Sequence, residues 1–177
     1  MDIDIKQVIR TVPDFPKPGI DFFDITSIVE NPVAFRKTVN WLVKLVAKYE
    51  IDHIVAVDAR GFIWGGAVAN DIHIPLHLAR KPGKLPGELV TRTYSLEYGT
   101  ATLSMLKSAP IIGRVMVIDD ILATGGTLNA VGELLAENWK IRPDNQVHAS
   151  VVGLDFLPGR TILENRGYIV ETLVSYQ

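Results

Sequence analysis

The chain has 177 residues, of which 47% are hydrophobic and 21% charged, and its formal net charge is -2. This size and composition are typical of one soluble globular domain, so we expect residues 1–177 to form a single domain. The slight negative charge gives no general attraction to nucleic acid or to an acidic membrane surface, and we expect neither as a partner. The absence of cysteine excludes disulfides, thiolate catalysis and sulfur-based zinc sites.

The first residues, MDIDIKQVIR, contain no apolar run long enough for a signal peptide. No segment of the chain approaches the roughly 20 apolar residues needed to span a bilayer. We therefore expect a cytoplasmic protein.

Patterns of helices and strands alternate along the first half. Asn31-Pro32 is typical of a helix start, and the residues that follow predict one apolar helical face, made of Phe35, Val39, Leu42, Val43 and Val46. The run HIVAVD predicts a short buried strand at 53–58, and IPLHLAR predicts another strand at 74–80. The glycine-containing stretch GFIWGGAVAND predicts a closely packed helix between them.

In the second half, residues 81–88 (KPGKLPGE) are too rich in proline and glycine to be anything but a loop. Alternating polar and apolar residues on either side of SLEYG predict a two-stranded excursion. The remaining elements are a core strand at RVMVIDD, a helix at GTLNAVGELLAENW with Leu128, Val131, Leu134 and Leu135 on one face, and strands at VHASVVGL and near 168–174.

This alternation predicts an α/β fold with a doubly wound, mainly parallel sheet flanked by helices. In such folds ligands bind beyond the carboxyl ends of the strands. Asp58, Arg80 and Asp119 fall at such ends, which makes them candidates for a site.

The stretch VMVIDDILATGGT (115–127) predicts a phosphate-binding turn. Gly125 and Gly126 allow the backbone to turn with its N–H groups pointing inward, and Thr124 and Thr127 add hydroxyl donors. The helix that follows presents its positive end to the same place. Together these groups form a nest for one phosphate.

Asp119 and Asp120 directly precede this turn. Two carboxylates repel a phosphate but accept hydrogen bonds from hydroxyls, so a ribose 5-phosphate satisfies both features, with its diol on the acids and its phosphate in the turn. A Walker A loop and a dinucleotide-binding fingerprint are both absent. The structural alternative is a strand end with solvated acids and a glycine-rich helix entry.

The segment VIDDILATGGT resembles the signature of type I phosphoribosyltransferases, which bind 5-phosphoribosyl 1-pyrophosphate. The likeness covers nearly the whole chain, in the family's order and spacing, through PDFPKPGIDFFDIT, DARGFIWG, ARKPGKLPGE and YSLEYGT. The last two segments are typical of members that act on adenine. The resemblance implies transfer of the 5-phosphoribosyl group to N9 of adenine, giving AMP and pyrophosphate. It also implies a small hood at about 1–30 and a flexible lid hairpin at about 81–106.

The resemblance assigns roles to charged residues. Arg60 would bind the pyrophosphate and Glu97 would transfer the proton from the purine, which makes these two the candidate catalytic residues. The phosphoribosyl group would be bound by the acid pair and the turn, with Tyr98 on the phosphate side. Arg80, Lys81 and Lys84 would surround the pyrophosphate, and in one arrangement they would reach it from the partner subunit. The substrate-binding set is thus Arg60, Arg80, Lys81, Lys84, Tyr98, Asp119, Asp120, Ala123, Thr124, Gly125, Gly126 and Thr127.

Each of these segments also has a structural explanation. Arg60 can be a helix-entry arginine paired with a surface acid, the basic run at 80–92 a solvated loop, and Glu97-Tyr98 an exposed loop tip.

For the base, the resemblance implies that the main chain at Asp21 hydrogen-bonds the purine edge, that Phe22 stacks on it and that Leu122 covers the other face. We expect one of Phe22 and Phe23 to belong to the hydrophobic core. Phe23 stands where many adenine-specific members have arginine, and Ala59 where many have serine.

The resemblance further implies a homodimer and magnesium, which would bind mainly through the substrate pyrophosphate and ribose hydroxyls rather than at a protein metal site. The four histidines, His53, His73, His77 and His148, are scattered without metal-ligand spacing. Two other functions remain open: a regulator that senses the sugar phosphate and binds nucleic acid, and a transferase for hypoxanthine, guanine or orotate.

Overall fold

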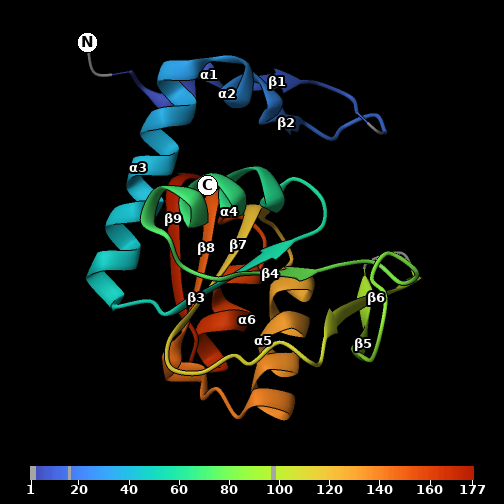
Figure 1. The fold of residues 1–177 in the computed structure, drawn as a ribbon. Coiled ribbons are helices and arrows are strands. Elements are labelled where there is room, and N and C mark those ends of the chain that lie inside the picture. The colour runs from blue at the N-terminus through green and yellow to red at the C-terminus, as the bar shows by residue number, and fades with distance from the viewer. Residues whose placement is uncertain (1–2, 16, 97–98) are drawn as a thin grey trace.

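The computed structural model describes residues 3–15, 17–96 and 99–177 (Figure 1). Its centre is a five-stranded sheet in the order β4-β3-β7-β8-β9, with every neighbouring pair parallel. The direction of winding reverses between β3 and β7, which is therefore the switch point of the sheet. The strands are β3 (His53–Val57), β4 (Leu76–Ala79), β7 (Val115–Leu122), β8 (Gln146–Leu154) and β9 (Ile169–Tyr176).

Helices cover both faces of this sheet (Figure 1). One face packs against α3 (Pro32–Tyr49) and α4 (Gly61–Ile72), and the other against α5 (Gly126–Trp139) and α6 (Gly159–Asn165). Because both faces are covered, β8 is buried over eight of its nine residues, including the polar Gln146, His148 and Ser150. The predicted doubly wound α/β fold is confirmed.

Helix α3 begins as predicted, because the Asn31 side chain accepts hydrogen bonds from the N–H groups of Val33 and Ala34, both at 3.1 Å. Its buried face is rotated from the predicted one, and Phe35, Val43 and Val46 are only partly buried. The residues that lie deepest are Ala34, Thr38, Val39, Leu42 and Leu45. Thr38 can face inward because its hydroxyl accepts a hydrogen bond of 2.8 Å from the Trp64 indole.

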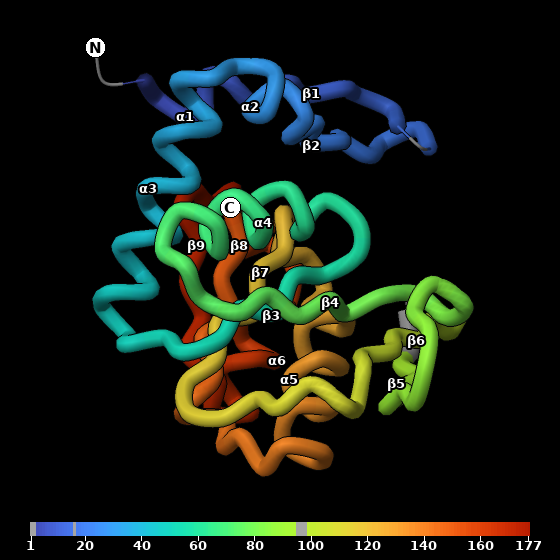
Figure 2. Tube along the Cα trace, viewed as in Figure 1, coloured from blue at the N-terminus to red at the C-terminus, as the bar shows by residue number. Residues whose placement is uncertain are grey.

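The N-terminal elements form a hood, which consists of α1 (Ile5–Val8), β1 (Arg10–Val12), β2 (Phe22–Asp24) and α2 (Thr26–Glu30). Strands β1 and β2 pair antiparallel in a small sheet of their own. The hood lies over the end of the central sheet where β7, β8 and β9 finish (Figures 1 and 2). It therefore roofs the carboxyl edge, where ligands bind in this class of fold.

A hairpin of β5 (Leu89–Leu96) and β6 (Gly99–Leu106) extends to one side of the sheet (Figure 1). It confirms the predicted two-stranded excursion. An isolated bridge between Arg80 and Ser104 joins the hairpin to the end of β4. A short 3-10 helix, η1 (Pro143–Asn145), precedes β8. Among the described residues, no helix has the length and apolar character that crossing a bilayer requires.

Candidate active site

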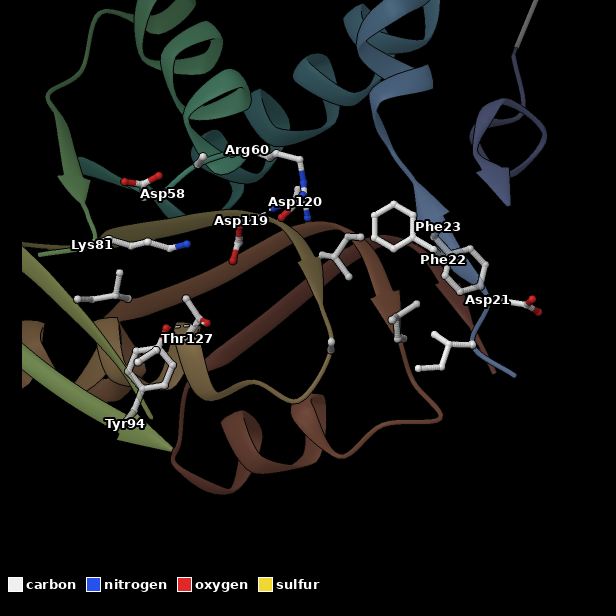
Figure 3. Close-up of a pocket in the computed structure, with 17 residues that line it drawn as sticks. Asp21, Phe22, Phe23, Asp58, Arg60, Lys81, Tyr94, Asp119, Asp120 and Thr127 are labelled. Carbon is white, nitrogen blue, oxygen red and sulfur yellow. Dashed lines mark hydrogen bonds and ion pairs between the residues drawn. The ribbon is translucent and has the colours of Figure 1, made fainter. Parts of the chain in front are cut away.

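A cavity of about 650 Å³ opens beyond the carboxyl ends of β3 and β7, between the hood and the hairpin (Figure 3). Its walls come from the β2 region (20–23), the turn after β3 (58–60), the end of β7 and its loop, and the hairpin. These segments are far apart in the sequence and meet at the switch point of the sheet. This is the place where the sequence predicts a ligand.

Asp119 and Asp120 differ in their surroundings. Asp120 is 5% exposed and accepts a hydrogen bond from Nε of Arg60 (Figure 3). Asp119 borders the cavity, and its Oδ1 accepts from the main-chain N–H of Asp120 at 2.9 Å. Burial and the charge of Asp120 raise the pKa of Asp119 well above the usual carboxyl value. One acid is thus neutralised by arginine and the other is left for a ligand.

Arg60 therefore has a partner that sequence reasoning did not foresee. The proposed alternative was a surface acid, but Asp120 is buried. Nearly half of the Arg60 side chain is exposed, and the residue lines the cavity, so its remaining N–H groups can still reach an anion there.

Residues 123–127 line a small recess that adjoins the main cavity, beside Asp119. Gly125 has a φ of 78°, the left-handed conformation that glycine accepts most readily. No side chain caps the start of α5, so an anion in the recess can take that place. These features are those that a phosphate-binding turn requires, and the binding of phosphate there stays a prediction.

Gly159, at the start of α6, is a residue that the sequence did not point to. A Cβ atom at this position would lie 2.1 Å from the carbonyl oxygen of Ala123 and 2.8 Å from the nitrogen of Gly125. The backbone of α6 therefore supports the backbone of the turn directly, and only glycine leaves room for this contact.

The hairpin also contacts the turn. The hydroxyl oxygens of Tyr94 and Thr127 are 3.1 Å apart, and Tyr94 lines the cavity. On the same strand, Arg92 forms ion pairs with Glu133 at 2.5 Å and Glu137 at 2.6 Å, which tie β5 to α5. Tyr94 was not singled out from the sequence.

The basic residues of the segment 80–84 differ in their positions relative to the cavity. Lys81 lines the cavity, and its side chain points into it (Figure 3). Arg80 instead donates to Asp58 at 3.1 Å and to the carbonyl oxygen of Lys84 at 3.3 Å. Lys84 is exposed and is not among the residues that line the described cavity.

The base-binding candidates form the opposite end of the cavity. Asp21 and Phe22 line it, and the Asp21 side chain points away from it, which leaves the main chain as the group available to a ligand (Figure 3). Phe23 also lines the cavity and packs against the main core, in line with the expectation that one of the two phenylalanines is a core residue.

The prediction that Leu122 covers the base is wrong for its side chain. Leu122 is 2% exposed and belongs to the core under α5. Neighbouring residues on a strand point to opposite sides, so Ile121 faces the cavity in its place, together with Leu154.

Glu97 and Tyr98 lie outside the described residues. The histidines are not all scattered, because Nδ1 of His53 lies 3.0 Å from Nε2 of His77. Burial and His53 lower the pKa of His77 to about 4, and burial lowers the pKa of His148 to about 3. Within residues 3–15, 17–96 and 99–177, no group of three or more His, Asp or Glu is arranged to hold a metal ion.

A family model described as "Phosphoribosyl transferase domain" matches residues 24–139, which include the turn, the acid pair and the hairpin. The chain is 43% identical to an adenine phosphoribosyltransferase of Idiomarina loihiensis over 98% of this chain and 97% of that protein. It is 42% identical to one of Kosmotoga olearia over 98% and 100%. The chain therefore belongs to the phosphoribosyl transferase family and, within it, to the adenine phosphoribosyltransferases.

Solved structures agree with this assignment. The adenine phosphoribosyltransferase of Thermoanaerobacter pseudethanolicus superimposes with a TM-score of 0.87 at 38% identity, covering 97% of this chain and 98% of that one. The enzyme of Giardia lamblia, complexed with 9-deazaadenine, gives a TM-score of 0.89 at 32% identity, with 98% and 97% covered. The resemblance noted from the sequence is confirmed.

Proposed function

We propose that this chain transfers the 5-phosphoribosyl group of 5-phosphoribosyl 1-pyrophosphate to N9 of adenine and releases AMP and pyrophosphate. The observation that carries the proposal is that a cavity and the recess beside it bring together a glycine-rich turn, the carboxyl group of Asp119 and an aromatic segment. Relatives at 40–43% identity carry the name of this activity. The related structure from Trypanosoma brucei holds AMP, pyrophosphate and ribose-5-phosphate.

The lining residues suggest one orientation for the phosphoribosyl donor, 5-phosphoribosyl 1-pyrophosphate. Its 5-phosphate would occupy the recess at 123–127, where main-chain N–H groups and the hydroxyls of Thr124 and Thr127 would donate to it. Its ribose hydroxyls would then donate to Asp119, with Asp120 held beside it by Arg60. As C1' becomes oxocarbenium-like, these carboxylates would stabilise the developing positive charge.

The departing pyrophosphate would lie toward Lys81 and the exposed part of Arg60, the two cations that line the described cavity. Arg80 and Lys84 are not among the residues that line the described cavity, and Arg80 instead donates to Asp58 at its edge. We propose that they reach the pyrophosphate of a partner subunit in a homodimer, which is consistent with the exposed position of Lys84.

The carboxylates at the cavity fit a magnesium ion that is held mainly by water and by the substrate. Magnesium keeps several waters and commonly binds through one or two carboxylates plus substrate phosphates. Asp119 and Asp120 supply two such carboxylates, and the described residues contain no larger acidic cluster. We propose that Asp119 or Asp120 assists in holding the ion through water, while the substrate supplies most ligands. When bound, the ion draws negative charge toward the leaving pyrophosphate.

Adenine would lie between Phe22 and the Ile121–Leu154 side of the cavity. A main-chain acceptor at Asp21 would take a hydrogen bond from the exocyclic amine, whereas a 6-oxo purine would oppose that acceptor with its own oxygen. Glu97 would take up the proton released as N9 attacks, and Tyr98 would contact the phosphate side. Support for these two roles is the segment YSLEYGT alone.

The proposal is tested by adenine-dependent release of pyrophosphate from the donor in the presence of magnesium. We expect release that requires both adenine and the ion, and AMP in equal amount by mass spectrometry. Pyrophosphate release without adenine would instead indicate hydrolysis of the donor. We further propose a cytoplasmic location, where both substrates would be available to the enzyme.

A further inference from the structure

Side-chain packing holds the hood over the central sheet, and hood residues such as Ile25 and Ile28 belong to the main core. Among the described residues, β1 and β2 pair only with each other and share no ladder with the central sheet. Within the hood, Phe22 meets Phe15 edge-on at a centroid distance of 5.1 Å. The position of β2 over the cavity therefore depends on packing rather than on main-chain hydrogen bonds.

Phe23 supplies such a contact. Its ring lies 4.1 Å from the ring of Tyr176 between centroids, with the planes tilted by 32°. Phe23 also lines the cavity, where Figure 3 shows its ring beside that of Phe22. One residue thus faces the proposed base site and rests on the last residue of β9.

Tyr176 is well suited to act as a fixed support. It is paired with Leu154 in the β8–β9 ladder, and its carbonyl oxygen accepts a hydrogen bond of 2.8 Å from the N–H of Asp155. Its ring packs against the main core, and Nζ of Lys6 lies 5.2 Å from the ring centroid. The Phe23–Tyr176 pair therefore joins strand β2 of the hood to the end of β9.

The pairing of Tyr176 with Leu154 adds a second link to the base site, because Leu154 itself lines the cavity. The same pair of strands thus provides one wall of the cavity through Leu154 and fixes the other through Tyr176 and Phe23. The width of the space available to a planar base depends on this arrangement.

We infer that Tyr176 is a positioning residue for adenine, which sets the location of Phe23 and of the β2 segment without touching the base. This inference rests on the proposed function. Replacing Tyr176 by a smaller aliphatic residue should let Phe23 move away from the cavity, so the site should bind a planar base less well. The donor site, at the other end of the cavity, should be unaffected.

The test is steady-state kinetics of Tyr176→Leu and Tyr176→Phe with adenine and donor varied separately. Loss of an aromatic pair corresponds to a change of about 3- to 10-fold in binding. We expect Tyr176→Leu to raise KM for adenine by about that factor, with kcat and the donor KM changed by less than about 2-fold. Tyr176→Phe keeps the ring and should behave as wild type.

Tyr49→Leu is the matched control, because Tyr49 is also a partly buried tyrosine packed on the main core, and it lies at the end of α3 remote from the hood (Figure 1). It should lose comparable stability in thermal unfolding while both KM values hold. A double-mutant cycle with Phe23→Leu measures the coupling directly, and we expect Tyr176→Leu to have little further effect on adenine KM in that background.

If Tyr176→Leu lowers kcat and raises the donor KM and the adenine KM by similar factors, its role is merely structural and the inference is overturned. An unchanged adenine KM in Tyr176→Leu would also overturn the inference. Independent effects in the double-mutant cycle would do the same. A wild-type protein that forms no AMP from adenine would instead contradict the proposed function, so the two failures are distinguishable.

Discussion

The hydroxyl oxygens of Tyr94 and Thr127 lie 3.1 Å apart and join strand β5 of the hairpin to the first turn of α5. A threonine hydroxyl has one proton to donate and two lone pairs that accept. If Tyr94 donates to Thr127, the proton of Thr127 is left to point at a phosphate in the turn. Tyr94 then orients a donor of the phosphate site from the opposite wall of the cavity.

Tyr94→Phe should therefore weaken binding of the phosphoribosyl donor and spare adenine. A hydrogen bond of this kind is worth about 0.5–1.5 kcal/mol, so we expect the donor KM to rise by about 2- to 10-fold. Thr93→Val is the control, since Thr93 makes a similar hydroxyl contact of 3.0 Å with Thr102 on the exposed side of the hairpin. An unchanged donor KM in Tyr94→Phe, or an equal rise in Thr93→Val, would contradict this role.

Gly159→Ala should distort the turn at 123–127, where we propose that the 5-phosphate binds. The added methyl group would collide with the backbone of Ala123 and Gly125, which has no freedom to move without distorting the turn. We expect a loss of about 2 kcal/mol or more in the free energy of unfolding, together with a raised donor KM.

Gly66→Ala provides the comparison for that experiment. Gly66 lies inside α4, where an added Cβ has open space, so alanine should be neutral or stabilise by about 0.5–1 kcal/mol. Urea denaturation and donor titration of both variants measure the difference. Equal behaviour of the two variants would mean that the contact between α6 and the turn is unimportant.

Much of this site was predictable because its signals are local. Helix α5 runs from Gly126 to Trp139 as its sequence indicates, and the turn before it is marked by its glycines and threonines. The acid pair and the two-stranded excursion could be placed for the same reason. Such features depend on residues close together in the chain, and sequence periodicity and turn chemistry report on those.

The missed features depend on contacts between distant segments. Gly159 supports a turn more than 30 residues away in the chain, and Arg60 and Asp120 are joined only because β3 and β7 are neighbours. The assignment of Leu122 failed because β7 is apolar on both sides, so its sequence does not show which residues face the cavity. The short elements of the hood and α6 are too brief for periodicity to reveal.

The negative charge of Asp119 should lower the stability of the ligand-free protein at neutral pH. Its pKa is raised on folding by burial and by Asp120. Between the unfolded and folded pKa values the folded state binds more protons, so the free energy of unfolding falls as pH rises through that window and stays low above it.

Asp119→Asn should abolish that part of the pH dependence and stabilise the protein by about 1 kcal/mol at neutral pH, while product formation falls sharply. Denaturant unfolding of both proteins from acidic to neutral pH gives the comparison. Asp71→Asn, at an exposed carboxylate, should leave the wild-type pH dependence in place. If Asp119→Asn is less stable than wild type at neutral pH, the charge of Asp119 does not destabilise the folded protein.

Glu97→Ala tests the proton-transfer role inferred from the segment YSLEYGT. General acid–base catalysis typically contributes about 10²–10⁴-fold, so kcat should fall by at least about 100-fold while both KM values change little. Glu97→Gln, which keeps the size and removes the acid, should show the same fall. If affinity collapses and turnover holds, Glu97 binds substrate rather than moving a proton.

The most direct measurement of the central claim is a competition in one vessel. Purified protein is given 5-phosphoribosyl 1-pyrophosphate, magnesium and equal amounts of adenine, hypoxanthine, guanine and orotate, and the nucleotides formed are identified by mass spectrometry. We predict AMP as the only product, which would also mean that Phe23 and Ala59 are tolerated in an adenine site. Another nucleotide would keep the fold and the donor site but contradict the base assignment, and bound donor without any product would contradict catalysis itself.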